Sequence, residues 1–176
     1  ITNWIYEFNS GGGSRNVATK GWQIGVTTIY ASGPAIAVGG GPPLGLFGGA
    51  NRPNRASGEK RTDVSASNFD PGKDLYLNIG AFSQPAAYTF GDVGRVEGDL
   101  RGFGMFNENV SLLKRTFIPA LGEEGNVEFR FEFFNLFNHT AFGSPAANIN
   151  NAAGYGKVGS QRNQPRHIQF QLKVNF

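Results

Sequence analysis

The side chains that most often carry out chemistry are few in this sequence, and their spacing matches no common site. The 176 residues include two histidines, His139 and His167, and no cysteine. The histidines do not form a His-x-x-x-His pair or a similar metal-ligand spacing. The lack of cysteine excludes thiolate metal sites and disulfide frameworks. We therefore expect no metal site and place both histidines at strand ends, as interfacial or surface residues.

Acidic and glycine-rich segments also lack the spacing that catalysis or ligand binding would require. The run Gly39–Gly41, like Gly48–Gly49, is not followed by the Gly-Lys-Ser/Thr of a phosphate loop, so loop flexibility explains it better. No Gly-x-Ser-x-Gly elbow is present. Five aspartates lack EF-hand spacing, namely Asp63, Asp70, Asp74, Asp92 and Asp99. The sequence predicts no catalytic residue, no cofactor and no enzyme activity.

Composition narrows the class of protein further. The chain has 26 Gly, 16 Phe and a net charge of +3, with Lys and Arg scattered singly. Such scatter provides no basic stripe for nucleic acid, and interior glycine disfavours long helices. No stretch of 18 apolar residues is present for a spanning helix, yet a mean hydropathy of -0.29 suits alternating barrel strands. The start Ile1–Trp4 lacks an initiator Met and an export signal, so we expect an internal or processed piece.

The last strand gives the clearest pattern. Residues 166–176 alternate with a period of two, which predicts a strand that is wet on one face and apolar on the other. The apolar parity holds Ile168, Phe170, Leu172, Val174 and Phe176, and the polar parity holds Gln169, Gln171, Lys173 and Asn175. An aromatic end after such a strand resembles the assembly signal of outer-membrane proteins, with Phe176 in that role. The last strand of a soluble sandwich is the alternative for this segment alone.

A second alternating strand is predicted over residues 126–137. Its two parities are Val127, Phe129, Phe131 and Phe133 against Glu128, Arg130 and Glu132. A helix would spread these Phe around its axis, so a strand is favoured. The register suggests that Glu128 pairs with Lys173. Phe134, Leu136 and Phe137 break the alternation and suggest an aromatic girdle or a bulge.

Three more strands complete the predicted pattern, over residues 2–8, 21–31 and 105–117, where Glu108 interrupts the apolar parity. The intervening links alternate in length. Those at 9–20 and 118–125 are short, and those at 32–104 and 138–165 are long. Bacterial barrels have short periplasmic turns and long extracellular loops. We expect Ser10–Asn16 to form a turn or linker, and some local strand or helix within 32–104, near Leu75–Ile79.

The predicted fold is therefore all-β. Antiparallel strands form one segment, 1–176, from the C-terminal part of a transmembrane β-barrel. The predicted lipid-facing residues are Val127, Phe129, Phe131, Phe133, Ile168, Phe170, Leu172 and Val174. The predicted lumen-facing residues are Glu128, Arg130, Glu132, Gln169, Gln171 and Lys173.

The chain also resembles a known family, the TonB-dependent receptors of the Oar-like kind, which carry a carboxypeptidase-regulatory-like domain. The segments that carry the resemblance are Gly21–Ile24, Ser32–Pro34, Asn51–Asn54, Ala81–Phe82, Thr89–Arg95, Leu100–Gly104, Ser111–Arg115, Phe129–Phe142 and Pro165–Phe170, with the terminal Phe176. The resemblance implies a large bacterial outer-membrane barrel with an internal plug, inserted by the barrel-assembly machinery. It also implies energy supplied by TonB, through an N-terminal part that this chain lacks.

Two functions follow as expectations. The first is transport of an unidentified ligand, with the long loops meeting the ligand; Tyr76, Phe82, Tyr88 and Phe90 either recognise it or anchor the loop by packing. The partners would be outer-membrane lipid and the remainder of the barrel with its plug. The second is an extracellular fragment that self-assembles by strand addition into a structural or adhesive oligomer or filament. A soluble carbohydrate-binding sandwich is a distant third.

Overall fold

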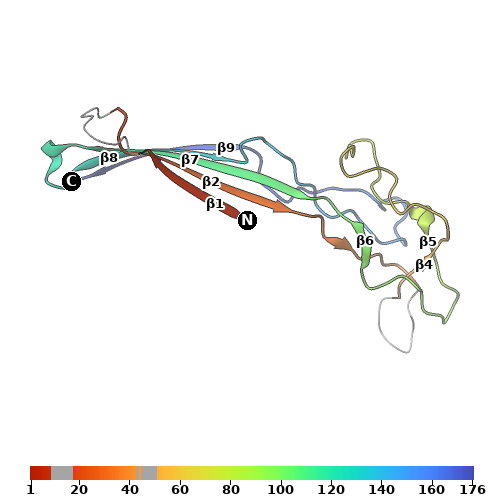
Figure 1. Cartoon of the computed structure of the whole chain (residues 1–176). Coiled ribbons are helices and arrows are strands. Elements are labelled where there is room, and N and C mark those ends of the chain that lie inside the picture. The colour runs from red at the N-terminus through yellow and green to blue at the C-terminus, as the bar shows by residue number, and fades with distance from the viewer. Residues whose placement is uncertain (9–17, 43, 45–50) are drawn as a thin grey trace. The chain divides into compact units, whose positions relative to one another are not determined.

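The structure is a computed structural model that describes residues 1–8, 18–42, 44 and 51–176. The predicted turn at Ser10–Asn16 therefore lies outside the described residues. The chain divides into two compact units (Figure 1). Unit 1 consists of Ile1–Ala31, Met105–Thr140 and Asn163–Phe176, and unit 2 consists of Ser32–Gly104 and Ala141–Arg162.

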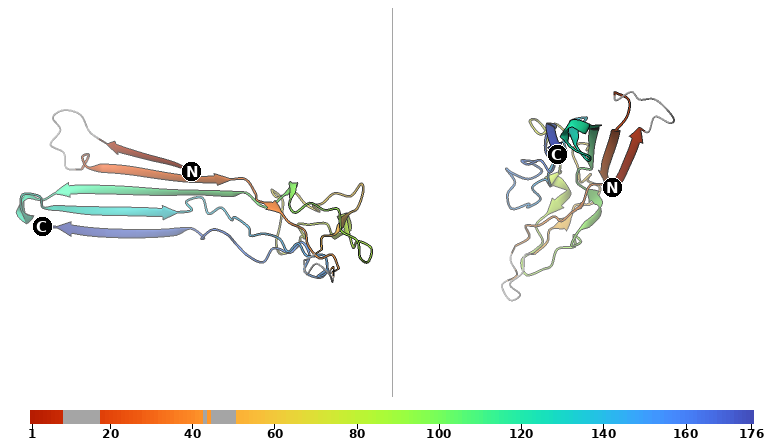
Figure 2. Two further views of the ribbon diagram at one scale, coloured as in Figure 1. Left: turned by 90° about the horizontal axis from the view of Figure 1, so that it is seen from below. Right: turned by 90° about the vertical axis from the view of Figure 1, so that its left-hand side faces the viewer.

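Unit 1 is a five-stranded sheet in which every neighbouring pair of strands is antiparallel (Figure 2). The order across the sheet is β1-β2-β7-β8-β9. The strands span Thr2–Phe8 (β1), Trp22–Ala31 (β2), Met105–Phe117 (β7), Asn126–Phe134 (β8) and His167–Asn175 (β9). The prediction of an all-β chain of antiparallel strands is confirmed.

Strand β8 ends three residues before the end of its predicted range, 126–137. Asn135 has a φ of 51° and Asn138 a φ of 56°, both in the left-handed region that Asn tolerates better than most residues. The backbone therefore turns away from the strand after Phe134. Leu136 and Phe137 lie in this turn rather than in a bulge of the strand.

The two classes of link lie at opposite ends of the sheet. The register places the links from β1 to β2 and from β7 to β8 at one end, and the links from β2 to β7 and from β8 to β9 at the other. The described part of the short links contains a 3-10 helix, η2, at Pro119–Leu121. The sheet thus has a short-link end and a long-link end.

Unit 2 is built from the two long links and has its own secondary structure. Strands β3 (Ala35–Ile36) and β6 (Glu97–Arg101) form one pair, and β4 (Asn54–Arg55) and β5 (Phe82–Ser83) form another. A 3-10 helix, η1, spans Ile79–Ala81. No helix among the described residues is long and apolar enough to cross a membrane.

Backbone pairing joins the two long links within unit 2. Gly39 forms a parallel bridge with Asn148, and the Tyr76 amide donates to the Gly156 carbonyl at 2.8 Å. Gly41 forms an antiparallel bridge with Asn51. The glycines predicted as a flexible loop are therefore held by sheet-like contacts where the structure describes them. Gly48 and Gly49 lie outside the described residues.

The hydrophobic core of the described residues lies in unit 2. An aromatic cluster forms its centre, with ring centroids 4.4 Å apart for Tyr76 and Phe103 and 5.1 Å apart for Phe103 and Phe142. The buried members of the core are Ile36, Val38, Phe69, Tyr76, Leu77, Ala81, Phe82, Val93, Leu100, Phe103, Ile149 and Tyr155. Both long links contribute to the core, so each needs the other to complete it.

Candidate functional site: the two faces of the sheet

One face of the unit 1 sheet is apolar and aromatic over all five strands. The pairing of β8 with β9 places Phe129 opposite Leu172 and Phe131 opposite Phe170, and the rings of Phe131 and Phe170 meet edge to face at 4.9 Å. We call this surface the apolar face. It holds Trp4, Tyr6, Phe8, Trp22, Ile24, Val26, Tyr30, Phe106, Val110, Leu112, Val127, Phe129, Phe131, Phe133, Ile168, Phe170, Leu172 and Val174.

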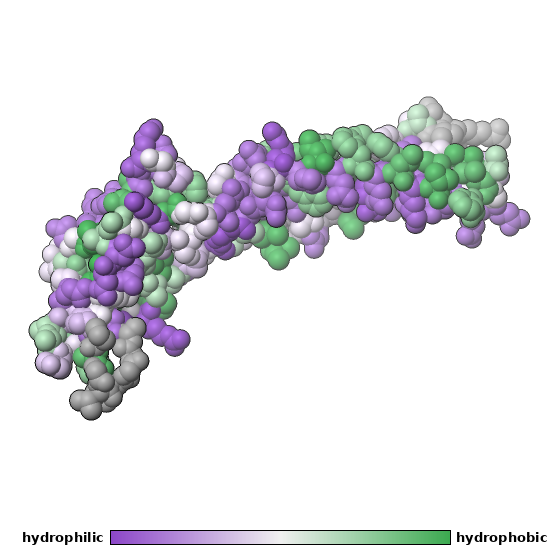
Figure 3. All heavy atoms as spheres, turned by 180° about the vertical axis from the view of Figure 1, so that it is seen from behind, coloured by the Kyte–Doolittle hydropathy of each residue, from purple (hydrophilic) through white to green (hydrophobic). Residues whose placement is uncertain are grey.

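The side chains of the apolar face are not covered by any layer among the described residues. Trp4 is 68% exposed, Phe170 62% and Leu172 66%. Figure 3 shows hydrophobic residues gathered in a strip over this unit, beside hydrophilic ones. Water-soluble monomers rarely expose contiguous apolar patches of more than a few hundred Å². The apolar face is therefore a surface built to contact something other than water.

The opposite face is polar and carries most of the sheet's charge, although Ile5, Ile29 and Leu113 also lie on it. We call it the polar face. Its polar residues include Glu7, Gln23, Thr27, Asn109, Ser111, Arg115, Glu128, Arg130, Glu132, Gln169, Gln171 and Lys173. The same alternation that makes one face apolar collects these residues on the other.

An ion pair on the polar face differs from the one predicted. Glu128 lies opposite Lys173 on β9, as the register suggested, and also opposite Arg115 on β7. The structure pairs Glu128 with Arg115, whose Nη2 and Nε lie 2.6 Å and 2.7 Å from Oε1. The forked donors of a guanidinium suit a carboxylate better than a single ammonium does.

A buried asparagine fixes the long-link end of the sheet. Asn135 is 1% exposed, and its side-chain amide donates to the carbonyl oxygens of His139 at 2.9 Å and Gln164 at 3.0 Å. Its Oδ1 accepts a hydrogen bond from the backbone amide of His139 at 2.9 Å. The backbone amide of Asn135 donates to Asn109 Oδ1, also at 2.9 Å. One residue, through its backbone amide and its side chain, thus ties together β7, the end of β8 and the approach to β9.

A carboxylate on the apolar face lies beside this corner. Glu108 is 6% exposed, and its Oε2 lies 3.3 Å from His139 Nδ1. The Glu108 carbonyl accepts from the Leu136 amide at 2.8 Å. The residue that interrupts the apolar parity of β7 therefore lies beside a histidine where the chain leaves the sheet.

A sheet with one exposed apolar face and one charged face is the construction of a membrane barrel wall. A family model described as an outer membrane beta barrel domain matches residues 1–169. The chain belongs to this family. No curated protein and no solved structure matches the chain.

Membership of the barrel family locates the protein in the bacterial outer membrane and associates it with membrane lipid. The eight residues predicted to face lipid all lie on the apolar face, and the six predicted to face the lumen all lie on the polar face. Which face meets lipid remains a prediction for these residues. The assembly role of Phe176, which is 97% exposed, also stays a prediction.

The aromatic residues singled out in the first long link of this barrel protein divide into two pairs. Tyr76 and Phe82 are buried, and burial raises the pKa of the Tyr76 phenol. Tyr88 is 94% exposed and Phe90 70% exposed. Tyr76 and Phe82 therefore anchor unit 2, and Tyr88 and Phe90 lie on its surface.

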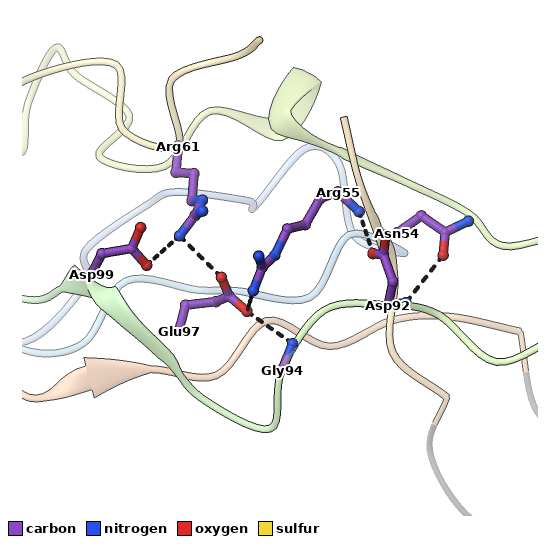
Figure 4. A network of polar contacts seen from close by, with 7 residues as sticks. All are labelled: Asn54, Arg55, Arg61, Asp92, Gly94, Glu97 and Asp99. Carbon is purple, nitrogen blue, oxygen red and sulfur yellow. Dashed lines mark hydrogen bonds and ion pairs between the residues drawn. The ribbon is translucent and has the colours of Figure 1, made fainter. Parts of the chain in front are cut away.

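A buried carboxylate organises the polar contacts of unit 2 (Figure 4). Glu97 is 1% exposed, and its two oxygens lie 2.8 Å from Arg55 Nη2 and 3.0 Å from Arg61 Nη1. The Gly94 amide also donates to it at 2.8 Å. Arg61 additionally pairs with Asp99. A backbone hydrogen bond, followed by this arginine, lowers the pKa of the Asp99 carboxyl.

Two more aspartates of the first long link also serve the backbone. Asp92 Oδ1 accepts from the Arg55 amide at 2.7 Å, and Asp74 Oδ2 accepts from the Asp70 amide at 2.8 Å. Among the described residues, no group of three or more potential ligand side chains is placed to hold a metal ion. These carboxylates therefore act in the structure as partners for backbone amides and cations.

Sequence reasoning missed the residues that hold the two units in shape. Glu97 and its partners Arg55 and Arg61 are far apart in the sequence and follow no local period. For Asn135 the sequence did contain a signal, because the alternation of apolar and polar residues in β8 ends there. The interruption by Glu108 was predicted, but the nearby position of His139 was not, because it depends on the turn that Asn135 makes.

Proposed function

We propose that the chain is part of a TonB-dependent outer-membrane receptor, in which unit 2 is the extracellular ligand-meeting part. The apolar face would contact lipid, and the polar face would line the lumen against a plug. The plug and the TonB contact would come from parts of the protein outside residues 1–176. The proposal rests on the ordered set of resembling segments and on three properties of the structure.

The direction of the edge strands carries the proposal. Four successive antiparallel pairings make β1 and β9 run in the same direction. Bacterial single-chain barrels contain an even number of antiparallel strands, of about eight or more. An antiparallel barrel that includes this sheet therefore needs an odd number of further strands between β9 and β1. A larger receptor barrel can supply them.

A ring of identical copies of this segment cannot close a barrel with antiparallel pairing throughout. Rotation about a barrel axis would place β9 of one copy beside β1 of the next, and those two strands would be parallel. The register of every observed pair in the sheet is antiparallel. This argument disfavours an oligomeric barrel built from this segment alone.

The folding of the long links supports a receptor over a simple pore. They leave the end of the sheet that barrels place outside the cell. They form a unit with a buried aromatic cluster and a buried ion-pair network. Tyr88 and Phe90 remain exposed on it. Such fixed surfaces favour ligand recognition, because ordering a loop upon binding costs affinity.

The facing of the sheet has a direct optical test. Both tryptophans of the sequence, Trp4 and Trp22, lie on the apolar face. In vesicles, brominated lipid chains should quench most of their fluorescence, and aqueous iodide should quench little. The reverse result would place the apolar face away from lipid. In a protein in which Trp4 and Trp22 are replaced by Phe, Gln171→Trp, on the polar face, should not be quenched by the brominated lipid.

The receptor function is tested on the native polypeptide. We expect an outer-membrane band much heavier than the 18.9 kDa of this chain, with heat-modifiable mobility, that is retained by an immobilised TonB periplasmic domain. A heavy, heat-modifiable band that TonB does not retain would contradict the receptor function and leave the barrel intact.

The unpaired edges keep strand addition as a second candidate. Among the described residues, β1 and β9 each pair with one neighbour only, and such edges can pair with other chains. Two copies joined edge to edge through β9 would be antiparallel. A band near 18.9 kDa released from cells, and crosslinking to itself through β9, would favour this candidate.

A further inference from the structure

Two charged residues interrupt the apolar face within the described strands, and both lie on β7. Glu108, near the long-link end, lies beside His139. Lys114 lies six positions further along, about 20 Å away at roughly 3.3 Å per residue. A barrel places lipid against one face of its sheet. If that is the apolar face, Lys114 presents an ammonium group to lipid near the short-link end.

The structure holds this ammonium against an aromatic ring. Lys114 pairs in register with Trp22 on β2, and its Nζ lies 5.3 Å from the centre of the indole. The ammonium also donates to the Lys20 carbonyl. The indole itself is oriented by its Nε1, which donates to the Ala18 carbonyl at 2.7 Å. Cation and ring are thus positioned together.

A depression of about 370 Å³ opens beside this pair. Phe8, Trp22 and Leu112 contribute apolar side chains from the sheet, and Ala18 and Thr19 complete the lining. Phe8, Trp22 and Leu112 share the apolar parity with Lys114. The depression therefore offers an apolar surface that includes Trp22, the same ring against which the ammonium of Lys114 is held.

The depth of Lys114 decides what this charge can meet. The residue lies three positions before the end of β7 at Phe117, about 10 Å along the strand. A lysine on the lipid face is costly at the midplane and nearly neutral at the interface. Lysine reaches toward the interface, where tryptophan is also enriched. We therefore expect the pair at the level of lipid headgroups, where phosphates are the available anions.

We propose that Lys114, Trp22 and the adjoining depression bind one phospholipid with a net negative headgroup, from the leaflet at the short-link end. The phosphate lies on the ammonium of Lys114, and the first part of an acyl chain lies on Phe8 and Leu112. Charge complementarity selects the headgroup, and the apolar depression retains the chain.

The test measures which lipids stay bound to the full-length protein. The protein is reconstituted in vesicles of phosphatidylcholine and phosphatidylglycerol, extracted in mild detergent and examined by native mass spectrometry. We expect Lys114→Gln to lower the retained phosphatidylglycerol about five-fold relative to phosphatidylcholine, the effect of one lysine near an anionic surface. Lys114→Arg should retain it.

A matched control separates a site from a general charge effect. Lys173→Gln removes the same charge from the polar face, one strand beyond Glu128, and should leave the lipid ratio unchanged. Heat-modifiable mobility confirms that each variant is folded. Unchanged retention in Lys114→Gln, equal losses in both glutamine variants, or an equal loss of both lipids in Lys114→Gln would each overturn the proposal.

Discussion

Units 1 and 2 differ in where they place their apolar side chains, although both are built mostly from strands and turns. In unit 2 the aromatic residues are gathered inside, and Phe103 is 4% exposed. In unit 1 they are spread over an open face, and Phe170 is 62% exposed. Unit 2 follows the rule of a water-soluble domain, whereas unit 1 leaves an apolar surface that the described residues do not cover. The contrast shows that a connection between barrel strands can itself be a folded domain.

Removing a ring from the core of unit 2 should have the largest effect. Phe103→Ala should destabilise unit 2 by about 3–5 kcal/mol, because it empties the centre of the aromatic cluster. Limited proteolysis of intact cells should then cut within 32–104, while the barrel stays heat-modifiable. The matched variant Phe170→Ala, on the apolar face, should leave the proteolysis of unit 2 unchanged. Equal sensitivity in both variants would mean that the units are not independent.

A charge placed on the apolar face should affect insertion instead. Phe131→Arg should cost membrane insertion about 2–4 kcal/mol if the side chain meets lipid near the midplane. Gln169→Arg, opposite Glu132 on the adjacent strand and on the polar face, is the control and should insert normally. The measurement is the folded, heat-modifiable yield in vesicles of a neutral lipid. An unchanged yield for Phe131→Arg would contradict its lipid-facing assignment.

The buried carboxylate of unit 2 should matter more than its exposed neighbour. Glu97→Gln should destabilise unit 2 by about 1–3 kcal/mol, because a hydrogen-bonded charge that two arginines share is lost. Asp99→Asn should have a smaller effect, because the Asp99 side chain is 71% exposed. Thermal proteolysis of unit 2 compares the two variants. A larger loss in Asp99→Asn would contradict the role given to Glu97.

The stability of unit 2 should also respond slightly to acid through Asp99. Its folded-state pKa lies below the ordinary value of 3.8, so its contribution to stability is present above that pH and declines as the pH falls through the folded pKa. Acid should therefore weaken unit 2 slightly less in Asp99→Asn than in the wild type. Identical acid profiles of proteolysis would show that the contacts of the Asp99 carboxylate, the backbone hydrogen bond first and the pair with Arg61 second, contribute nothing.

One substitution should stabilise unit 2. The Tyr155 hydroxyl is buried and has no hydrogen-bond partner among the described residues, and burial raises its pKa. Tyr155→Phe should therefore gain about 1 kcal/mol. A raised folded-state pKa also means that wild-type stability falls as the pH rises above about 10, and the Phe variant should lack this contribution. A destabilised variant at neutral pH would show that the hydroxyl has a partner.

The sequence predicted unit 1 much better than unit 2, for a physical reason. Strand alternation is a local signal, so the two faces of β8 and of β9 can be assigned from the sequence without knowing which strands they pair with. The core of unit 2 depends on contacts between distant residues, such as Phe103 with Phe142, and no local sequence pattern predicts them. The Glu97 network is equally non-local. The turn at Asn135 was partly predictable. The broken alternation of β8 indicated where the strand ends, but not which hydrogen bonds Asn135 makes.

The interleaving of the two long links also sets an order of assembly. The bridge between Gly39 and Asn148 and the contact between Tyr76 and Gly156 close loops that contain β7 and β8. Closing such long loops is slow and entropically costly until the remaining contacts form. A nascent chain emerging from its N-terminus cannot complete unit 2 until residues beyond β8 have appeared. The first long link therefore lacks part of its core, Ile149 and Tyr155 among it, while the middle of the barrel wall is being made.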